Sequence, residues 1–256
     1  MTSSAGIITT ATERVAALVE QVRSGNVRAV SRLITLLERQ HPDGTEGLRL
    51  LSSEAHPRLV IGVTGYPGAG KSTLIDALVR VYRRQGLKVA VLAVDVSSAM
   101  TGGALLGDRV RMQDHADDPD VYIRSMATRG HYGGVARATC DARHVLEAAG
   151  YDVVLIETVG VGQNEADILQ VAPTVIAVVA PGLGDEVQAM KAGLLEIAHI
   201  IVVNKCDHPG AENTLRDLRQ WCPVVIGTSA TTGDGLPQLF AAIVAHQGQH
   251  RARHVG

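Results

Sequence analysis

The stretch GYPGAGKST at residues 65–73 constrains the fold more than any other part of the chain. It matches the pattern G-x-x-x-x-G-K-[ST], follows an apolar run and precedes a helical pattern. In this context the glycines let backbone N–H groups turn onto phosphate oxygens, and the start of the following helix adds a favourable dipole. The stretch therefore predicts a strand, a phosphate-binding loop and a helix, in that order.

Two side chains of this loop carry specific expectations. Lys71 is expected to reach the β- and γ-phosphates of a nucleotide, and Ser72 to coordinate Mg²⁺. The remaining contacts to the phosphates are expected from the neighbouring positions Gly65, Gly68, Ala69, Gly70 and Thr73.

From residue 59 onward, predicted strands alternate with predicted helices along the chain. Most of the strand-like runs are apolar on both faces, which is typical of parallel strands covered by helices on each side. They lie at residues 59–64, 88–94, 121–123, 152–157, 174–180, 200–204 and 223–227. Helical patterns lie between or after them, at residues 71–85, 134–149, 185–197, 210–221 and 235–247. The alternation predicts an α/β fold with a doubly wound, mostly parallel sheet.

Residues 1–55 precede these alternating strands and helices and are interpreted as a short N-terminal helical extension. Apolar residues at helical spacing within 10–41 predict two helices, and the polar segment HPDGTEG follows them. The P-loop domain is expected over residues 56–247, and residues 248–256 are expected to form a polar tail that frays.

Bulk composition excludes several classes of function. A formal net charge of −2 and a pI near 6.5 give no electrostatic reason to expect nucleic-acid binding. No apolar run approaches the roughly 18 residues that indicate a membrane span, and the N-terminus lacks the pattern of a signal peptide. Three widely spaced cysteines fit reduced thiols, so a cytoplasmic protein is expected.

The motif NKCD at residues 204–207 indicates which base is bound. The carboxylate of Asp207 can accept hydrogen bonds from guanine N1–H and from the exocyclic amine, a donor pair that adenine lacks. Asn204 is expected to brace the phosphate loop, and the stem of Lys205 to cover the base. Ser229 and Ala230 follow the next strand and resemble the loop that contacts the guanine carbonyl. GTP and GDP are therefore the expected ligands.

The run ending at Glu157 is followed by Thr-Val-Gly, where many GTPases carry D-x-x-G. Glu157 is expected to orient Mg²⁺ and the Gly160 N–H to sense the γ-phosphate. Val161 occupies the place of the glutamine that orients the attacking water in Ras-type proteins, and Gln163 is two residues away. Slow intrinsic hydrolysis, accelerated by a partner or by another group of the chain, is the expectation.

Asp95 ends the strand after the phosphate-loop helix, where its carboxylate would face Mg²⁺. The long Gly- and Ser-rich segment after it, residues 96–112, includes Asp108 and is interpreted as a first switch. His131 lies in another long loop and is interpreted as a solvated histidine rather than a metal ligand.

Several longer segments resemble the MeaB/ArgK family of P-loop GTPases, whose older name is LAO/AO transport ATPase. They are VDVSSAMTGGALLGDRVRM, YDVVLIETVGVGQNEADI, PGLGDEVQAMKAG and VVNKCD. The resemblance implies a GTPase chaperone that gates adenosylcobalamin loading and protects an adenosylcobalamin-dependent acyl-CoA mutase, usually methylmalonyl-CoA mutase. It also implies a phosphate–magnesium site of Lys71, Ser72, Asp95, Asp108 and Glu157, and a catalytic contribution from Lys191 in a third switch.

Two departures from the family pattern affect these expectations. The family's first switch reads Asp-Pro-Ser-Ser-Pro, whereas this chain has Val96 and Ala99 in place of the prolines, so a less rigid loop is expected. The family's C-terminal dimerisation arm has no counterpart before Gly256, which leaves the usual homodimer open.

Three alternatives stay open at this point. A metallochaperone GTPase of the HypB type shares the glutamate in the switch, but it would need a cysteine or histidine metal site. A nucleotide-driven transport protein or kinase is disfavoured by NKCD and by the lack of a membrane segment. A GTP-binding module that does not hydrolyse GTP is compatible with Val161.

Overall fold

The computed structural model describes residues 11–51, 59–95, 115, 117–127, 134–158, 167–182 and 194–254. These residues fall into two compact units. One unit comprises Met1–Pro57 with Cys140–Tyr151, and the other comprises Arg58–Thr139 with Asp152–Gly256. Each unit has its own buried apolar side chains.

The first unit contains α1 (Ala11–Arg23), α2 (Val27–Glu38), α3 (Pro42–Leu51) and the greater part of α6 (Gly134–Ala148). The buried face of α2 carries Val30, Leu33, Ile34 and Leu37, as the helical spacing predicted. The side chain of Asn26 caps α2 by accepting hydrogen bonds from two backbone N–H groups of the first turn. The two predicted helices within residues 10–41 are therefore confirmed.

The third helix was not predicted. The segment HPDGTEG looked like a polar linker, yet α3 begins within it at Pro42. A Cβ at Gly44 would lie 2.8 Å from the backbone of Leu36, and one at Gly47 would lie 2.7 Å from the side chain of Leu33. The glycines therefore permit α3 to approach α2 closely, and tertiary packing overrides their low helix propensity.

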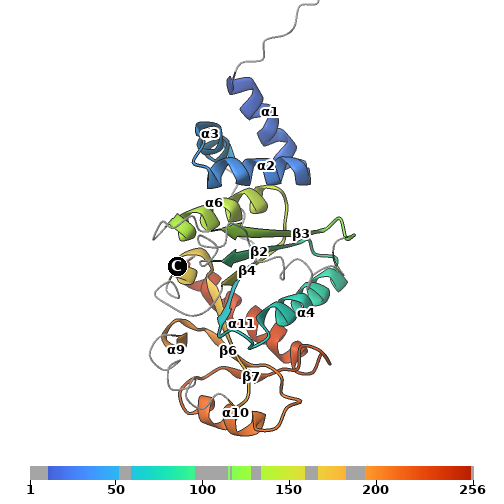
Figure 1. Ribbon diagram of the computed structural model, residues 1–256, viewed down its shortest axis with the longest axis vertical. Helices are drawn as coiled ribbons and strands as arrows, with labels where there is room; N and C mark the ends of the chain where they lie inside the picture. The colour runs from blue at the N-terminus through green and yellow to red at the C-terminus, as the bar shows by residue number, and fades with distance from the viewer. Residues whose placement is uncertain are drawn as a thin grey trace, which may run out of the picture. The chain divides into compact units, whose positions relative to one another are not determined.

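The second unit is built on a seven-stranded sheet in the order β3-β2-β4-β1-β5-β6-β7, in which every neighbouring pair is parallel. Figure 1 shows the strands that carry labels. The bounds are β1 Leu59–Gly65, β2 Val89–Asp95, β3 Val121–Ala127, β4 Val153–Thr158, β5 Thr174–Val179, β6 Ile200–Val203 and β7 Val225–Gly227. The predicted α/β class is confirmed.

Helices cover both faces of the sheet, as the apolar strands require. On one face, α4 (Lys71–Arg84) and α11 (Leu236–His254) pack their buried side chains against alternate residues of the central strands. On the other face, α7 (Asp167–Val171) lies so close to β1 that a Cβ at Gly62 would be 2.6 Å from Ile168. The side chain of Leu218 in α10 (Ala211–Arg219) packs against β6 on this same face.

Two predicted helices near the C-terminal half of the chain can be compared with the structure at their ends. Helix α11 continues to His254, so most of the predicted polar tail is helical. The short α9 (Leu194–Ile197) is the described end of the predicted helix at 185–197, and the rest of that helix lies outside the described residues.

Candidate functional site

The phosphate loop joins the carboxyl end of β1 to the amino end of α4. Its last glycine, Gly70, is the N-cap of α4 and has a left-handed backbone with φ of 91°. The Lys71 ammonium is buried and donates hydrogen bonds to the carbonyl oxygens of Gly65 (2.8 Å) and Tyr66 (3.1 Å). The positively charged ammonium group is therefore held against the backbone of the phosphate loop, near the N–H groups at the start of α4.

Two glycines of this loop both have a positive φ, but they differ in how closely other atoms approach them. Gly65 has φ of 140°, and a Cβ there would lie 2.1 Å from the carbonyl oxygen of Val178 in β5. Gly68 has φ of 80°, and no heavy atom lies within 4 Å of a Cβ built there.

We expect Gly65→Ala to lower the free energy of unfolding by about 3 kcal/mol or more, because a backbone atom of a central strand must move. The matched variant Gly68→Ala should cost only about 1 kcal/mol, the strain of a left-handed alanine. Urea unfolding of the two variants measures the difference. Equal losses in the two variants would contradict this account of Gly65.

The side chains of Ser72 and Glu157 bring together two oxygen atoms that could coordinate a metal, beside the first turn of α4. The hydroxyl of Ser72 donates a hydrogen bond of 2.9 Å to a carboxylate oxygen of Glu157, and both residues are buried. Glu157 lies on β4, beside β1 and next to the start of α4. A hydroxyl and a carboxylate are ligands that suit Mg²⁺, so the donors present fit the predicted metal.

The other predicted switch residues are less fully described. Asp95 is the last residue of β2, so its backbone lies at the same edge of the sheet as Glu157. Asp108, Gly160 and Lys191 lie outside the described residues, as do Val161, Gln163 and His131. Their predicted roles therefore stay predictions.

Asn204 connects the predicted base-binding side to the phosphate loop. Its side-chain amide nitrogen donates to the carbonyl oxygens of Ala69 (3.1 Å) and Gly70 (3.4 Å). Its side-chain oxygen accepts from the Thr228 hydroxyl (3.2 Å) and from the Ala230 N–H (3.1 Å). One buried side chain thus joins three loops, and the bracing role predicted for Asn204 agrees with this geometry.

Lys205 has an unusual backbone for a lysine, with φ of 59°. This left-handed turn directs its ammonium toward the phosphate loop, where it donates a 2.8 Å hydrogen bond to the carbonyl oxygen of Gly68. The sequence predicted that the stem of Lys205 covers the base, but it did not reveal this second bridge between the two loops.

The side chain of Asp207 is a partly exposed carboxylate that can accept hydrogen bonds from a ligand. The Ser229 side chain donates to its carboxylate and is the main reason why the pKa of Asp207 lies below its usual value. Nearly half of the Asp207 side chain is exposed, so a ligand can reach it. Asp207 and Ser229, both predicted site residues, are therefore brought together, and Asp207 is ionised at neutral pH.

The loop after β7 owes its shape to close backbone contacts. The Cys206 N–H donates to the carbonyl oxygen of Thr228, which ties this loop to the NKCD loop. A Cβ at Gly235 would lie 1.9 Å from the carbonyl oxygen of Gly227, so only glycine fits there. The close contact at Gly235 and the hydrogen bond from the Thr228 hydroxyl to Asn204 were not predicted, although a Gly-x-Gly spacing at residues 233–235 is visible in the sequence.

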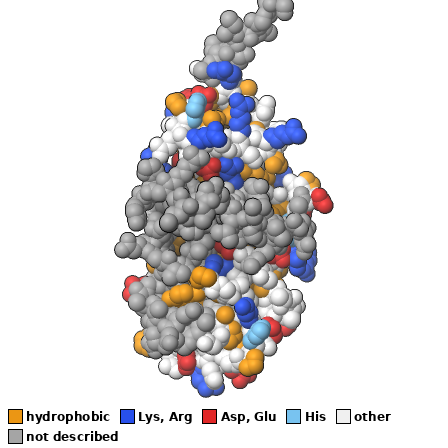
Figure 2. Space-filling model, in the orientation of Figure 1, with side chains coloured by type: hydrophobic (Ala, Val, Ile, Leu, Met, Phe, Trp, Pro, Cys, Tyr) orange, Lys and Arg blue, Asp and Glu red, His pale blue; other side chains and the backbone are white. Residues whose placement is uncertain are grey.

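The described residues give limited information on other classes of site. Among them, no group of three or more His, Cys, Asp or Glu side chains is arranged to hold a metal. None of the described helices is both long and apolar enough to cross a membrane. Burial raises the thiol pKa of Cys140, Cys206 and Cys222, which disfavours thiolate chemistry at these positions. Figure 2 shows acidic and basic side chains both exposed among the described residues of one face.

Comparison with known proteins places this geometry in a family. The family model described as methylmalonyl Co-A mutase-associated GTPase MeaB matches residues 30–254. The chain belongs to the MeaB family. The matched range contains the phosphate loop, Glu157 and the NKCD loop, so the site described above lies within the MeaB region.

Similar proteins agree with the MeaB assignment. A protein of Pyrococcus abyssi is 49% identical over 243 residues, which cover 90% of this chain and 75% of that protein. GTPase ArgK of Escherichia coli is 38% identical over 244 residues, or 88% of this chain and 74% of that one. The methylmalonic aciduria type A homolog of Caenorhabditis elegans, a mitochondrial protein, is 39% identical over 74% of this chain and 51% of its own length.

Solved structures show the same fold. A LAO/AO transport system kinase superposes with a TM-score of 0.73 at 30% identity, covering 97% of this chain and 79% of its own. The hydrogenase maturation factor HypB of Archaeoglobus fulgidus superposes with a TM-score of 0.55 at 20% identity, over 86% of this chain and 97% of its own. At that level of identity the HypB likeness shows a shared fold alone.

Proposed function

We propose that this chain binds and hydrolyses GTP, gates adenosylcobalamin loading and protects an adenosylcobalamin-dependent acyl-CoA mutase, such as methylmalonyl-CoA mutase. The observation that carries the proposal is the MeaB match over residues 30–254. It includes both the loop that fits phosphates and the loop that fits guanine. The family's description as methylmalonyl Co-A mutase-associated supports the choice of partner, and the geometry of the described site supports the nucleotide chemistry.

The nucleotide part of the proposal assigns a role to each side of the site. Lys71 would neutralise the β- and γ-phosphates, because its buried ammonium already lies within the loop. Asp207 would accept from guanine, supported by its lowered pKa. Ser72 and Glu157, with Asp95 and Asp108, would hold Mg²⁺, which would supply a positive charge at the phosphates when bound.

We also propose that the chain acts as a switch whose intrinsic rate of GTP hydrolysis is slow. Valine cannot orient the attacking water, so Val161 supports weak intrinsic turnover. We propose that Gly160 senses the γ-phosphate and that Lys191 or a partner side chain supplies the missing catalytic group. The cytoplasm remains the predicted compartment.

The test is GTP turnover by the purified chain, measured alone and with methylmalonyl-CoA mutase, with and without adenosylcobalamin. We expect the mutase to accelerate phosphate release at least about tenfold, as a partner that completes the catalytic group would do. We also expect GTP hydrolysis to be required for transfer of the cofactor to the mutase. Bovine serum albumin at the same concentration is the control.

Two outcomes of that experiment would contradict the proposal. If GTP turns over but the mutase changes neither turnover nor cofactor loading, the chaperone role is wrong and another partner must be sought. If GTP binds and no phosphate is released even with the mutase, the chain is a binding module that does not hydrolyse GTP.

A further inference from the structure

Helix α2 carries three arginines along its exposed side. Arg28, Arg32 and Arg39 are all exposed, and they stand at positions i, i+4 and i+11, with Arg39 as the C-cap residue. At about 100° per residue, these positions fall within about 40° of one another around the helix axis. The buried side chains of α2, among them Leu33 and Leu37, lie on the opposite side. We call the three arginines the α2 arginine row.

The α2 arginine row has no acidic partner in the part of the chain that the structure describes, where no carboxylate lies within ion-pair distance of its side chains. The neighbouring helices differ in this respect. Arg23 of α1 pairs with Glu20, and Arg49 of α3 pairs with Glu46. Figure 2 shows basic side chains exposed over the helices that Figure 1 labels α1, α2 and α3.

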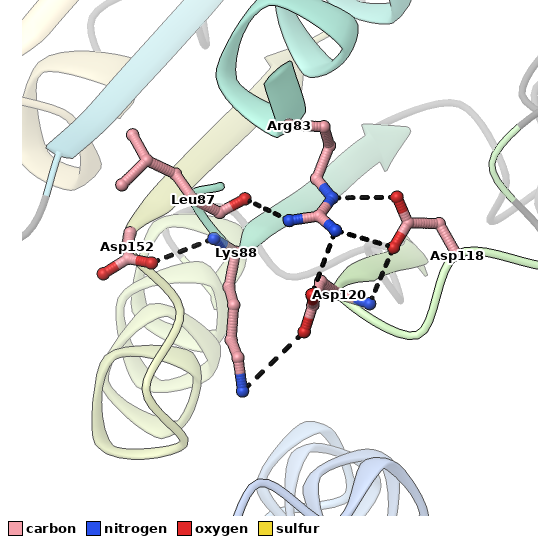
Figure 3. A network of polar contacts seen from close by, with 6 residues as sticks. All are labelled: Arg83, Leu87, Lys88, Asp118, Asp120 and Asp152. Carbon is pink, nitrogen blue, oxygen red and sulfur yellow. Dashed lines mark hydrogen bonds and ion pairs between the residues drawn. The ribbon is translucent and has the colours of Figure 1, made fainter. Parts of the chain in front are cut away.

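An arginine that does hold this fold together looks different. The guanidinium of Arg83 in α4 donates to both carboxylate oxygens of Asp118 (2.8 and 3.1 Å) and to Asp120 (2.9 Å). Figure 3 shows this fork, with Lys88 reaching Asp120 from the other side. Arg83 thereby fastens the segment before β3 to α4. The α2 arginine row makes no contact of this kind, so it is not a structural fastening.

The placement of the row is also unfavourable for α2 itself. The N-terminus of a helix is the positive end of its dipole, so acidic side chains are favoured in the first turn. α1 has Glu13 there and α3 has Asp43, whereas α2 has no acidic residue in its first turn and carries Arg28 instead. Arg28 and Arg32, four residues apart, also repel each other. Residues that break such local rules without a gain in the fold are typical of functional surfaces.

The chemistry of the row fits a partner that presents carboxylates. Guanidinium groups bind carboxylates and phosphates through paired hydrogen bonds, so an acidic protein face and a nucleic acid both carry matching groups. A net charge of −2 gives the chain no field to attract a nucleic acid. The row is also short, about 16 Å from Arg28 to Arg39, which suits one acidic element of a protein. Val27, which is 46% exposed, offers an apolar contact beside Arg28.

We propose that the α2 arginine row is the docking surface for an acidic face of a protein partner. The inference rests on the proposed function, in which that partner is the acyl-CoA mutase, and it adds where on this chain the mutase binds. Carboxylates of the partner would neutralise Arg28 and Arg32 and relieve the repulsion between them. Exposed ion pairs are screened by salt, so the association should weaken as ionic strength rises.

The test uses two charge-reversed variants of the full chain with the same net charge. Arg28→Glu/Arg32→Glu reverses two cations of the row, and Arg216→Glu/Arg219→Glu reverses two exposed cations in the last turn of α10. Binding to immobilised methylmalonyl-CoA mutase is measured at low ionic strength. We expect the row variant to lose about tenfold or more in affinity, and the control to stay within about twofold of the wild type.

Urea unfolding separates a docking role from a structural one. Arg28→Glu/Arg32→Glu places an acid at the N-terminus of α2, so it should unfold at the same urea concentration as the wild type or at a higher one. Arg216→Glu/Arg219→Glu places acids at the C-terminal turn of α10 and should unfold at a lower concentration. A lower unfolding midpoint in the row variant would show that the row stabilises the fold, and the inference would be overturned.

The binding outcomes distinguish the inference from the proposed function. If the mutase binds the wild type and the row variant equally, the inference is overturned and the proposed function stands. If the mutase does not bind the wild type, the mutase partnership of the proposed function is overturned. Poly-L-glutamate and a short duplex DNA then test the row by themselves. Binding of polyglutamate that is lost only in the row variant supports a site for an acidic protein. Equal binding by both variants, or tighter row-dependent binding of DNA, overturns it.

Discussion

Replacing Asp207 with asparagine is expected to lower the affinity for GTP by about a hundredfold or more. In the proposed complex the Asp207 carboxylate would accept from two guanine donors, whereas an asparagine amide would face the guanine amine with its own N–H group. A site built for these hydrogen bonds loses them and leaves buried donors unpaired, which is costly. Xanthosine triphosphate, which carries a carbonyl oxygen in place of the guanine amine, matches the asparagine pattern and should bind the variant better than GTP does.

Fluorescence titration with both nucleotides measures this exchange of specificity. Asp217→Asn is the control, because Asp217 is an exposed aspartate on α10, and it should leave both affinities as they are in the wild type. If Asp207→Asn kept its preference for GTP, the base would have to be read by another residue, and the guanine assignment of the NKCD loop would be wrong.

The second large effect is expected at the phosphates. Lys71→Ala should reduce the affinity for GTP and GDP by about a hundredfold, because a buried cation facing a polyanionic ligand is removed. The fold should be affected much less, because two hydrogen bonds of the ammonium go to carbonyl oxygens of its own loop, at Gly65 and Tyr66. Calorimetric titration together with thermal unfolding separates the two effects.

Lys88→Ala is the matched control for this prediction. Lys88 precedes β2, at the edge of the sheet opposite the phosphate loop, and its ammonium lies 3.8 Å from Asp120. Nucleotide affinity in this variant should equal that of the wild type. A similar loss in both lysine variants would mean that general charge, not the position of Lys71, governs binding.

The sequence was a good guide to the sheet because most of its strands are buried on both faces. A run of Val, Ile and Leu leaves little doubt about such a strand, and β4 and β5 agree with the prediction to within one residue. It was a poorer guide to β3, which continues to Ala127 through Arg124 and Ser125. Among the described strands β3 lies at the edge of the sheet and pairs with β2 alone, so polar side chains are tolerated and the apolar pattern breaks early.

The site was predictable where a motif carries the chemistry. The phosphate loop, Asn204, Asp207 and Ser229 lie together as the motifs indicated. The bridge from Lys205 to Gly68 depends on a left-handed backbone at a lysine, which residue identity does not reveal.

The contacts that His115, Asp118 and Asp120 make with α4 were also not predictable from the sequence. Residues 115–120, HADDPD, carry no apolar periodicity that would predict them. Only the fold shows that His115 is buried against Asp76 and that Arg83 reaches Asp118 and Asp120. Such contacts join residues about 40 positions apart, and local patterns carry no information at that range.

The central claim is that this site hydrolyses GTP and discriminates against ATP. The most direct measurement is phosphate release by the purified chain with Mg²⁺ and saturating GTP or ATP, with Lys71→Ala as the blank. We predict slow release from GTP, release from ATP at the level of the blank, and loss of the GTP signal in Lys71→Ala. Equal turnover of ATP and GTP, or GTP turnover that survives in Lys71→Ala, would contradict the account.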